Sequence, residues 1–237
     1  MKNTFLLLTA FAFFISCNYR ETVRGNGNAI TESRTVSSFR GVQLRGSMNV
    51  RLIKGADHAV TVEGEENILP YLETYVNDGK LIVKYRDGIN INTREDLVVN
   101  VTVPELDEIE VTGSGDITGE NKFLGDEKIK VEVTGSGDVN LELDAPAVEA
   151  SITGSGDIDL RGSTKHIKCS TTGSGEIDAS GLKSENATVR TLGSGSIRVF
   201  ASVKLDATIN GSGDIAYKGG ASVSSKIHGS GTVKAID

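Results

Sequence analysis

The chain has 237 residues, a formal net charge of −7, 28 glycines and no tryptophan. An acidic chain lacks the basic footprint that binding to nucleic acid requires, which excludes nucleic acid as a partner. The same charge gives no polybasic support for binding to a membrane surface, so a lipid would have to provide any tethering.

The amino terminus has the pattern of a bacterial export signal. Met1 and Lys2 form a charged start, and an apolar stretch from Phe5 to Ile15 follows that is too short for a transmembrane helix. Ser16-Cys17 then resembles the end of a lipobox. We therefore predict a lipoprotein signal peptide over residues 1–16 and lipid attachment at Cys17, with an ordinary secretory signal as the alternative. Either signal takes the mature chain out of the cytoplasm; with the lipid, we expect a location in the cell envelope, at the outer membrane, on its surface or its periplasmic face.

The next part of the chain has a weaker pattern. Residues 17–35 are polar, which favours a lipid-anchored tether over a degenerate first coil, and a single domain is expected over residues 36–237. Its first part, residues 36–106, is irregular. The segment 65–73 has a hint of helix that Pro70 interrupts, whereas residues 80–85 and 97–103 are typical of strands.

From residue 107 to 237 the chain is a regular repeat. Gly-Ser-Gly recurs at spacings of 22, 19, 19, 20, 18 and 18 residues, with its first glycine at Gly113, Gly135, Gly154, Gly173, Gly193, Gly211 and Gly229. Apolar residues alternate with polar ones before each glycine, and the fourth residue after it is always Ile or Val. Such alternation is typical of strands with one buried face. Each repeat is therefore predicted to be two short strands joined at a glycine corner.

A single repeat has too few inward side chains for a core of its own, so neighbouring repeats must stack. The predicted fold is all-β: a parallel β-helix or β-solenoid with coils of about 18–22 residues, right-handed as parallel crossovers usually are. An antiparallel sandwich is the alternative, although it would not require the same corner at near-constant spacing.

Several runs resemble one family. They are Ser38-Phe39-Arg40-Gly41-Val42, the segment from Val60 to Leu69, Asp78-Gly79-Lys80-Leu81-Ile82-Val83, and Val111-Thr112-Gly113-Ser114-Gly115-Asp116-Ile117. In this order they resemble the putative auto-transporter adhesin head GIN domain family, over about residues 38–220. The resemblance implies a β-helix-like, envelope-exposed and often lipid-anchored domain. It implies no ligand or catalytic residue.

The residue after each corner is usually acidic. The row consists of Asp116, Asp138, Asp157, Glu176 and Asp214, with Ser196 and Thr232 interrupting it. Calcium is one candidate ligand, but calcium-binding β-rolls repeat a nine-residue pattern and this period is about twice as long. The simpler interpretation is that each side chain accepts backbone N–H bonds at its own turn. No cofactor is otherwise expected.

Nothing in the sequence assembles a catalytic site. His58, His166 and His228 lie far apart and next to inward positions, so each is expected to face outward, and no Cys/His spacing fits a metal. With Cys17 used for lipid, Cys169 has no disulfide partner. It occupies an inward position, which predicts a buried small apolar residue.

Two functions are compatible with these residues. The leading hypothesis is a non-catalytic adhesion or structural module that binds a surface protein or glycan. The alternative is a glycan-active or glycan-binding β-helix that uses the one varied polar segment, which contains Arg86, Asp87, Arg94, Glu95 and Asp96.

The last coil suggests a further partner. Val233, Ala235 and Ile236 complete it without a polar capping segment. An uncovered coil end presents unpaired strand groups and an apolar edge. We therefore expect homo-oligomerisation or docking there.

Overall fold

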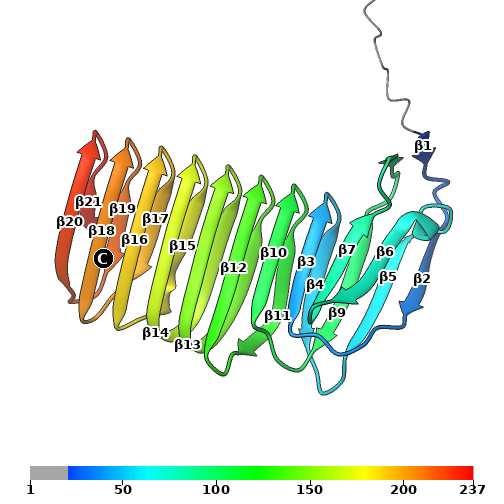
Figure 1. Cartoon of the computed structure of the whole chain (residues 1–237), viewed down its shortest axis with the longest axis horizontal. Coiled ribbons are helices and arrows are strands. Elements are labelled where there is room, and N and C mark those ends of the chain that lie inside the picture. Colours follow the sequence, from blue (N-terminus) through cyan, green and yellow to red (C-terminus); the bar gives the residue numbers. More distant parts are fainter. Residues whose placement is uncertain (1–20, 237) are drawn as a thin grey trace, which may run out of the picture.

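The computed structural model describes residues 21–236 and forms a rod of stacked strands in two layers (Figure 1). The predicted lipid attachment residue Cys17 and the signal peptide lie outside the described residues. Within those residues the only helical element is the 3-10 helix η1 (Leu69–Tyr71), where the sequence hinted at a helix. No helix of the described part is long and apolar enough to cross a membrane.

The first layer contains the strands that end at the glycine corners, with β6 and β7 added at its amino-terminal end. In spatial order it runs through β6 (Leu72–Asn77), β7 (Lys80–Tyr85), β3 (Gly41–Gly46), β10 (Glu108–Gly113), β12 (Lys128–Gly135), the second halves of β13 (Val139–Gly154) and β14 (Asp157–Gly173), β16 (Asn186–Gly193), β18 (Lys204–Gly211) and β20 (Ser222–Gly229).

The second layer contains the strands that leave the corners. Its order is β2 (Ala29–Arg34), β5 (Ala59–Glu65), β9 (Val98–Val103), β4 (Asn49–Lys54), β11 (Ile117–Leu124), the first halves of β13 and β14, β15 (Glu176–Lys183), β17 (Ser196–Phe200), β19 (Ile215–Lys218) and β21 (Val233–Ala235). Separately, β1 (Glu21–Arg24) pairs with β8 (Ile89–Asn92).

The stacking confirms the predicted parallel β-solenoid. Strands of successive coils are parallel and in register, with each corner glycine opposite the next, as Gly113 is opposite Gly135 and Gly135 opposite Gly154. The inward residues form continuous columns between the layers. In one of them Ala150, Cys169 and Val189 are aligned, and Cys169 is 1% exposed. Its burial confirms the prediction of a buried small apolar residue, and it raises the pKa of the Cys169 thiol to about 12.

The corners show why glycine recurs. The first glycine of every Gly-Ser-Gly has positive φ, for example +133° at Gly154, a region that other residues rarely adopt. Its carbonyl oxygen accepts two N–H bonds from the next coil. At Gly135 the donors are the backbone nitrogens of Ser155 and Gly156, at 2.8 and 3.2 Å. Each corner therefore holds the one stacked on it.

The amino-terminal end departs from the parallel pattern. β5 pairs antiparallel with both β2 and β9, and β6 pairs antiparallel with β7. Ile68, Leu69 and Leu72, in and around η1, are at most 3% exposed and cover the core at this end. Within residues 36–106, β3, β4, β7 and β9 still stack in parallel, so the distinct end structure consists of β2, β5, η1 and β6.

The predicted tether over residues 17–35 is wrong for residues 21–34, which form β1 and β2. Both strands pair with the domain, β1 with β8 and β2 with β5. The polar sequence misled the prediction because β2 is an edge strand: five of its six residues are exposed. A strand that buries almost no side chain has no alternating pattern to recognise.

Candidate functional site

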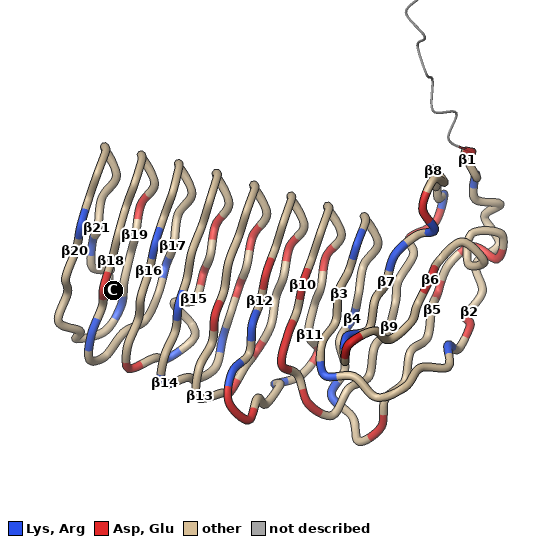
Figure 2. Tube along the Cα trace, in the orientation of Figure 1, with Lys and Arg blue, Asp and Glu red and all other residues tan. Residues whose placement is uncertain are grey.

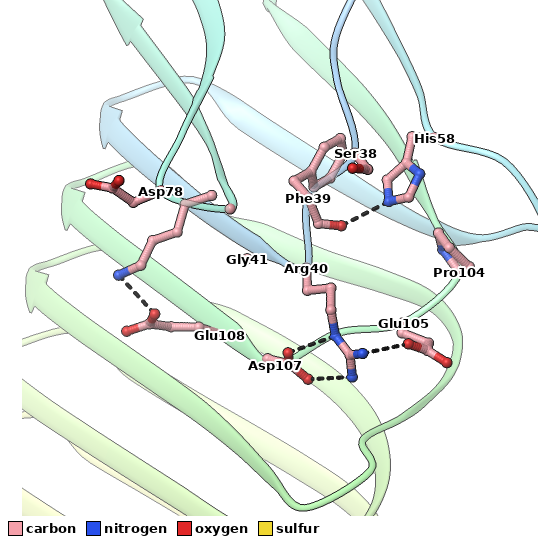
Figure 3. A pocket seen from close by; sticks show the side chains of 12 residues that line it. Ser38, Phe39, Arg40, Gly41, His58, Asp78, Pro104, Glu105, Asp107 and Glu108 are labelled. Carbon is pink, nitrogen blue, oxygen red and sulfur yellow. Dashed lines mark hydrogen bonds and ion pairs between the residues drawn. The ribbon is translucent and has the colours of Figure 1, made fainter.

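A polar cavity lies where the irregular end meets the regular coils. It is a cavity of about 530 Å³ lined by Ser38–Gly41, His58, Asp78–Lys80, Pro104–Glu105 and Asp107–Glu108 (Figure 3). The segment before β3 supplies one wall, and the β9–β10 connection supplies the other. His58 enters from the β4–β5 loop, and its Nε2 lies 2.8 Å from the carbonyl oxygen of Phe39.

Arg40 is the main cation of this cavity, and carboxylates surround it. Its guanidinium nitrogens lie 2.7 Å from Glu105 Oε2, 2.6 Å from Asp107 Oδ2 and 2.9 Å from Asp126 Oδ2. The hydrogen bond to Asp107 is the largest cause that raises the pKa of Arg40 above its ordinary value, and the hydrogen bond to Asp126 is the next largest. The guanidinium is therefore already engaged, which disfavours an anionic ligand at this point.

Lys80 is the second cation, and it is engaged as well. Its Nζ lies 2.7 Å from Glu108 Oε2 and 3.5 Å from Glu110 Oε2, and the hydrogen bond to Glu108 is the largest cause of its raised pKa. The cavity contains no serine–histidine pair or paired acids in hydrogen-bonding contact that could act as nucleophile and base. Its lining residues can contact a ligand.

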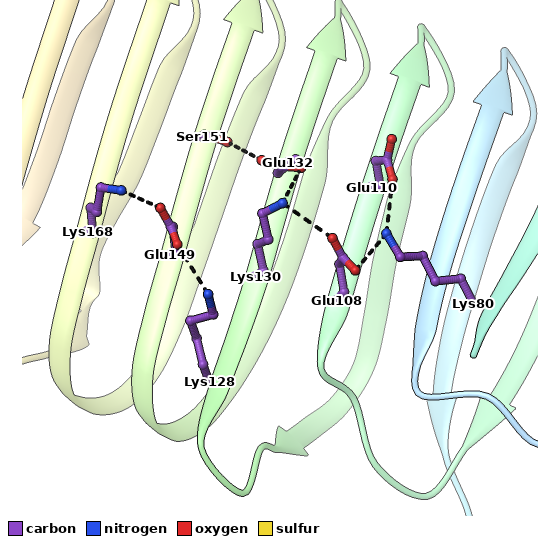
Figure 4. Close-up of polar contacts among 9 residues, drawn as sticks. All are labelled: Lys80, Glu108, Glu110, Lys128, Lys130, Glu132, Glu149, Ser151 and Lys168. Carbon is purple, nitrogen blue, oxygen red and sulfur yellow. Dashed lines mark hydrogen bonds and ion pairs between the residues drawn. The ribbon is translucent and has the colours of Figure 1, made fainter. Parts of the chain in front are cut away.

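The outer face of the first layer continues this charge pairing along the rod (Figure 4). Lys130 Nζ bridges Glu132 at 2.7 Å and Glu108 at 3.4 Å, and Glu149 joins Lys168 at 2.5 Å and Lys128 at 3.5 Å. These pairs are partly exposed, so each contributes little to stability. Because they cross from coil to coil, they favour the correct register.

The predicted corner carboxylates bond between coils. Asp116 Oδ1 accepts the backbone N–H of Asp138 at 3.0 Å, Asp138 Oδ1 that of Asp157 at 3.0 Å, and Asp157 Oδ1 that of Glu176 at 3.2 Å. Asp214 accepts the same bond from Thr232 at 2.9 Å. The interpretation that each side chain caps its own turn is wrong at these four positions, because stacking brings the next coil's N–H within reach.

Glu176 completes the row with a different role. Its carboxylate contacts the Arg198 guanidinium, which also lies 2.9 Å from Asp178. Within residues 21–236 no group of three or more His, Cys, Asp or Glu side chains could hold a metal ion. The structure thus gives these carboxylates a use that does not involve calcium.

We expect Asp138→Ala to lower the free energy of unfolding by about 1 kcal/mol, the usual contribution of one hydrogen bond. Asp138→Asn should cost less, because its amide oxygen can still accept the Asp157 N–H. Urea unfolding of both variants measures the difference.

In a thermal unfolding experiment the parent protein should melt at equal temperatures in EGTA and in millimolar calcium. A clear rise with calcium would reassign the row as a metal site.

The remaining candidate residues do not converge. His166 and His228 are exposed, as expected, whereas His58 is half-buried in the cavity. Arg86 lies 5.6 Å from the centre of the Tyr71 ring, and Asp87 pairs with Lys84 at 2.6 Å. Neither these residues nor Arg94, Glu95 and Asp96 line the cavity around Arg40. Sequence reasoning missed Arg40, Lys80 and Asp107 as site residues because they come together only through the stacking of β7, β3 and β10.

Known proteins are similar to this chain over most of its length. The family model described as "Putative auto-transporter adhesin, head GIN domain" matches residues 38–221. A crystal structure of a "putative lipid binding protein" from Parabacteroides distasonis has 26% identity and a TM-score of 0.76, covering 92% of this chain and 100% of its own. A "putative adhesin" from Parabacteroides merdae has 27% identity, a TM-score of 0.74 and the same coverage.

A third solved structure supports the fold alone. It is a "putative adhesin" from Bacteroides fragilis with 24% identity and a TM-score of 0.86, covering 90% of this chain and 100% of its own. No curated protein sequence matches the chain significantly. The matching proteins are described as adhesins or as a binding protein, and none of these descriptions names an enzyme.

Proposed function

Because the chain belongs to the putative auto-transporter adhesin head GIN domain family, we propose that it is a non-catalytic, lipid-anchored binding module of the cell envelope. The observation that carries the proposal is the regular outer face of the rod. Equivalent polar side chains lie in register from coil to coil, while the described residues bring no catalytic set together. Such a surface can make many weak contacts at once, which is how adhesion modules gain avidity.

The row next to the corners illustrates this surface. Thr112, Thr134, Thr153 and Thr172 are aligned across four coils, and all four are exposed. The serines of the Gly-Ser-Gly corners add a second exposed row beside them. Hydroxyl groups both donate and accept hydrogen bonds, so the face suits a polar surface such as a glycan or a protein backbone.

Attachment through Cys17 fits the start of the fold. Only three residues lie between Cys17 and Glu21, where β1 begins, and the four residue steps of an extended chain span at most about 14 Å. In this proposal the rod is held close to the membrane, and its outer faces remain accessible. The acylated residue would anchor it in the outer membrane.

The test is to express Cys17→Ala in the native host, with Cys169→Ala as the matched control. We expect Cys17→Ala to lose labelling by radioactive palmitate, to leave the membrane fraction, and to abolish adhesion of the cells. Cys169→Ala should keep all three properties. Membrane association of Cys17→Ala without palmitate would contradict the lipid anchor. Turnover of a glycan by the purified protein would contradict the non-catalytic assignment.

A further inference from the structure

The two ends of the rod both expose unpaired strand edges. Within the described residues β20 pairs only with β18 and β21 only with β19 at the carboxy-terminal end. At the amino-terminal end, β2 pairs only with β5 and β6 only with β7. Free edges with exposed apolar side chains are sites for pairing with another chain.

The carboxy-terminal end leaves core positions uncovered. Val223 and Ile227 continue the inward columns of Leu205 and Ile209, which are fully buried one coil earlier. On β20 the same positions are 38% and 42% exposed. This end therefore presents an apolar strip beside a free backbone edge.

The amino-terminal end offers a matching recess. A hollow of about 520 Å³ lies between the two edge strands and is lined by Glu32–Thr35 at the end of β2 and Leu72–Tyr75 of β6. Ile30 on β2 and Tyr75 on β6 are 39% and 44% exposed. Four of the seven exposed large apolar residues of the described chain thus lie on edge strands at the two ends.

The charges of the two ends are opposite. Residues 215–236 contain three lysines and no acidic residue, and none of the lysines forms an ion pair within residues 21–236: Lys218, Lys226 and Lys234. Residues 57–79, which include β5, η1 and β6, contain six acidic residues and no Lys or Arg: Asp57, Glu63, Glu65, Glu66, Glu73 and Asp78. The edge strand β2 adds Glu32 and Arg34, which pair with each other at 3.4 Å, and Glu73 lies 3.6 Å from Lys84, so the excess of acidic residues remains. Figure 2 shows acidic residues on β5 and β6 and basic ones on β20 and β21. The charges therefore favour contact of one end with the other over contact between two like ends.

We propose that the protein assembles head to tail, with the carboxy-terminal edge of one copy docked on the amino-terminal edges of the next. β20 of one copy would extend the first layer at β6 of its neighbour, and Val223 and Ile227 would enter the hollow between β2 and β6. Because the contact joins two different surfaces at opposite ends of the rod, each added copy leaves a free end, and repetition of the contact along the rod axis generates a filament.

The start of the described chain lies near one of the two contact surfaces. In Figure 1 β1 is at the same end of the rod as β2, above it, on the side where the Gly-Ser-Gly corners are. A rod held from that side can lie along a membrane with both ends accessible. Head-to-tail contact does not depend on the anchor, so purified protein suffices to test it.

The experiment compares two single-end variants by analytical ultracentrifugation at low and high salt. Ile227→Glu places a negative charge on the carboxy-terminal strip, and Tyr75→Lys places a positive charge beside the amino-terminal hollow. Both residues are already exposed, so the fold should tolerate the changes. Thr188→Glu, on an exposed position of β16 in the middle of the rod, is the charge control.

We expect the parent protein and Thr188→Glu to form species larger than dimers at low salt, with loss of assembly at high salt. Each end variant alone should be monomeric. Mixed together, the two variants should form one-to-one dimers, through the unchanged amino-terminal end of Ile227→Glu and the unchanged carboxy-terminal end of Tyr75→Lys. A monomeric parent at high protein concentration would overturn the proposal, and so would Tyr75→Lys assembling like the parent. Dimers of Tyr75→Lys alone would also overturn it, because they would indicate pairing of two carboxy-terminal ends.

Discussion

Replacing Gly154 by alanine should lower the free energy of unfolding by about 3 kcal/mol or more, a large fraction of the stability of an ordinary domain. Two effects combine at this corner. The φ of +133° is strained for any residue with a Cβ, and a Cβ at Gly154 would overlap the carbonyl oxygen of Gly135. That oxygen belongs to the corner below, so relief of the clash requires the two coils to separate.

Two other glycines provide controls that divide these effects. Gly27 has a φ of +75°, near the ordinary left-handed region, and a Cβ added there would meet no atom within 4 Å, so Gly27→Ala should show a smaller backbone strain and no clash. Gly220 has neither, and Gly220→Ala should change the free energy of unfolding by less than about 0.5 kcal/mol. Urea unfolding followed by circular dichroism measures all three variants. If Gly154→Ala unfolds at the same urea concentration as Gly220→Ala, the corner does not control stacking.

Replacing Glu65 by alanine should release the amino-terminal strands from the rod. Glu65 is 1% exposed, and its carboxylate accepts the backbone N–H of Gly27 at 2.6 Å and that of Arg94 at 2.9 Å. It thereby holds the β1–β2 turn and the β8–β9 connection against β5. Without the carboxylate these donors have no partner, so we expect amide hydrogen exchange in residues 21–34 to accelerate by roughly tenfold or more.

Low pH should produce the same release in the parent protein. Burial alone would raise the pKa of Glu65, but the N–H bonds from Arg94, Gly27 and Glu95 outweigh it and leave the pKa lowered. A carboxyl whose pKa is lower in the folded state adds stability above its unfolded pKa, and this stability is lost as pH falls through the folded value. Exchange in residues 21–34 should therefore accelerate below about pH 4, after correction for the intrinsic rate.

Two variants test whether Glu65 is the responsible group. Glu65→Gln cannot titrate, so its local exchange should lose this pH dependence. Glu63→Ala, which removes an exposed carboxylate two residues earlier on the same strand, should leave residues 21–34 protected at neutral pH. Equal acceleration in Glu63→Ala and Glu65→Ala would mean that the amino-terminal strands depend on general charge and not on this buried contact.

The regular half of the rod could be predicted from sequence because its physics is local and repeated. The alternation before Gly154 assigns Ile152 and Ala150 to the core, and the same count from Gly173 assigns Cys169 to it. All three are buried. The count also places Thr171 inward, and this residue is 1% exposed although its hydroxyl has no hydrogen-bond partner among the described residues. Position in the coil, and not side-chain polarity, decided burial there.

The amino-terminal end and the cavity could not be predicted in the same way. The polar strand β2 buries almost nothing, so only its pairing with β5 reveals it. Arg40 and Asp126 are separated by 86 residues, and the ion pair between them depends on coils that meet through the fold. In the regular coils, the repeat spacing shows which residues of neighbouring coils lie side by side. It does not show which residues are in contact where a regular coil meets an irregular one.

The one-on-one stacking of corners also makes the length of this rod adjustable. Each regular coil bonds only to the coil before it and the coil after it, and successive coils end in the same Gly-Ser-Gly corner. Loss or duplication of a whole coil, such as residues 174–193, would rejoin identical corners and change the reach of the rod by about 4.8 Å. A lineage could therefore lengthen or shorten this surface module one unit at a time while its two ends remain unchanged.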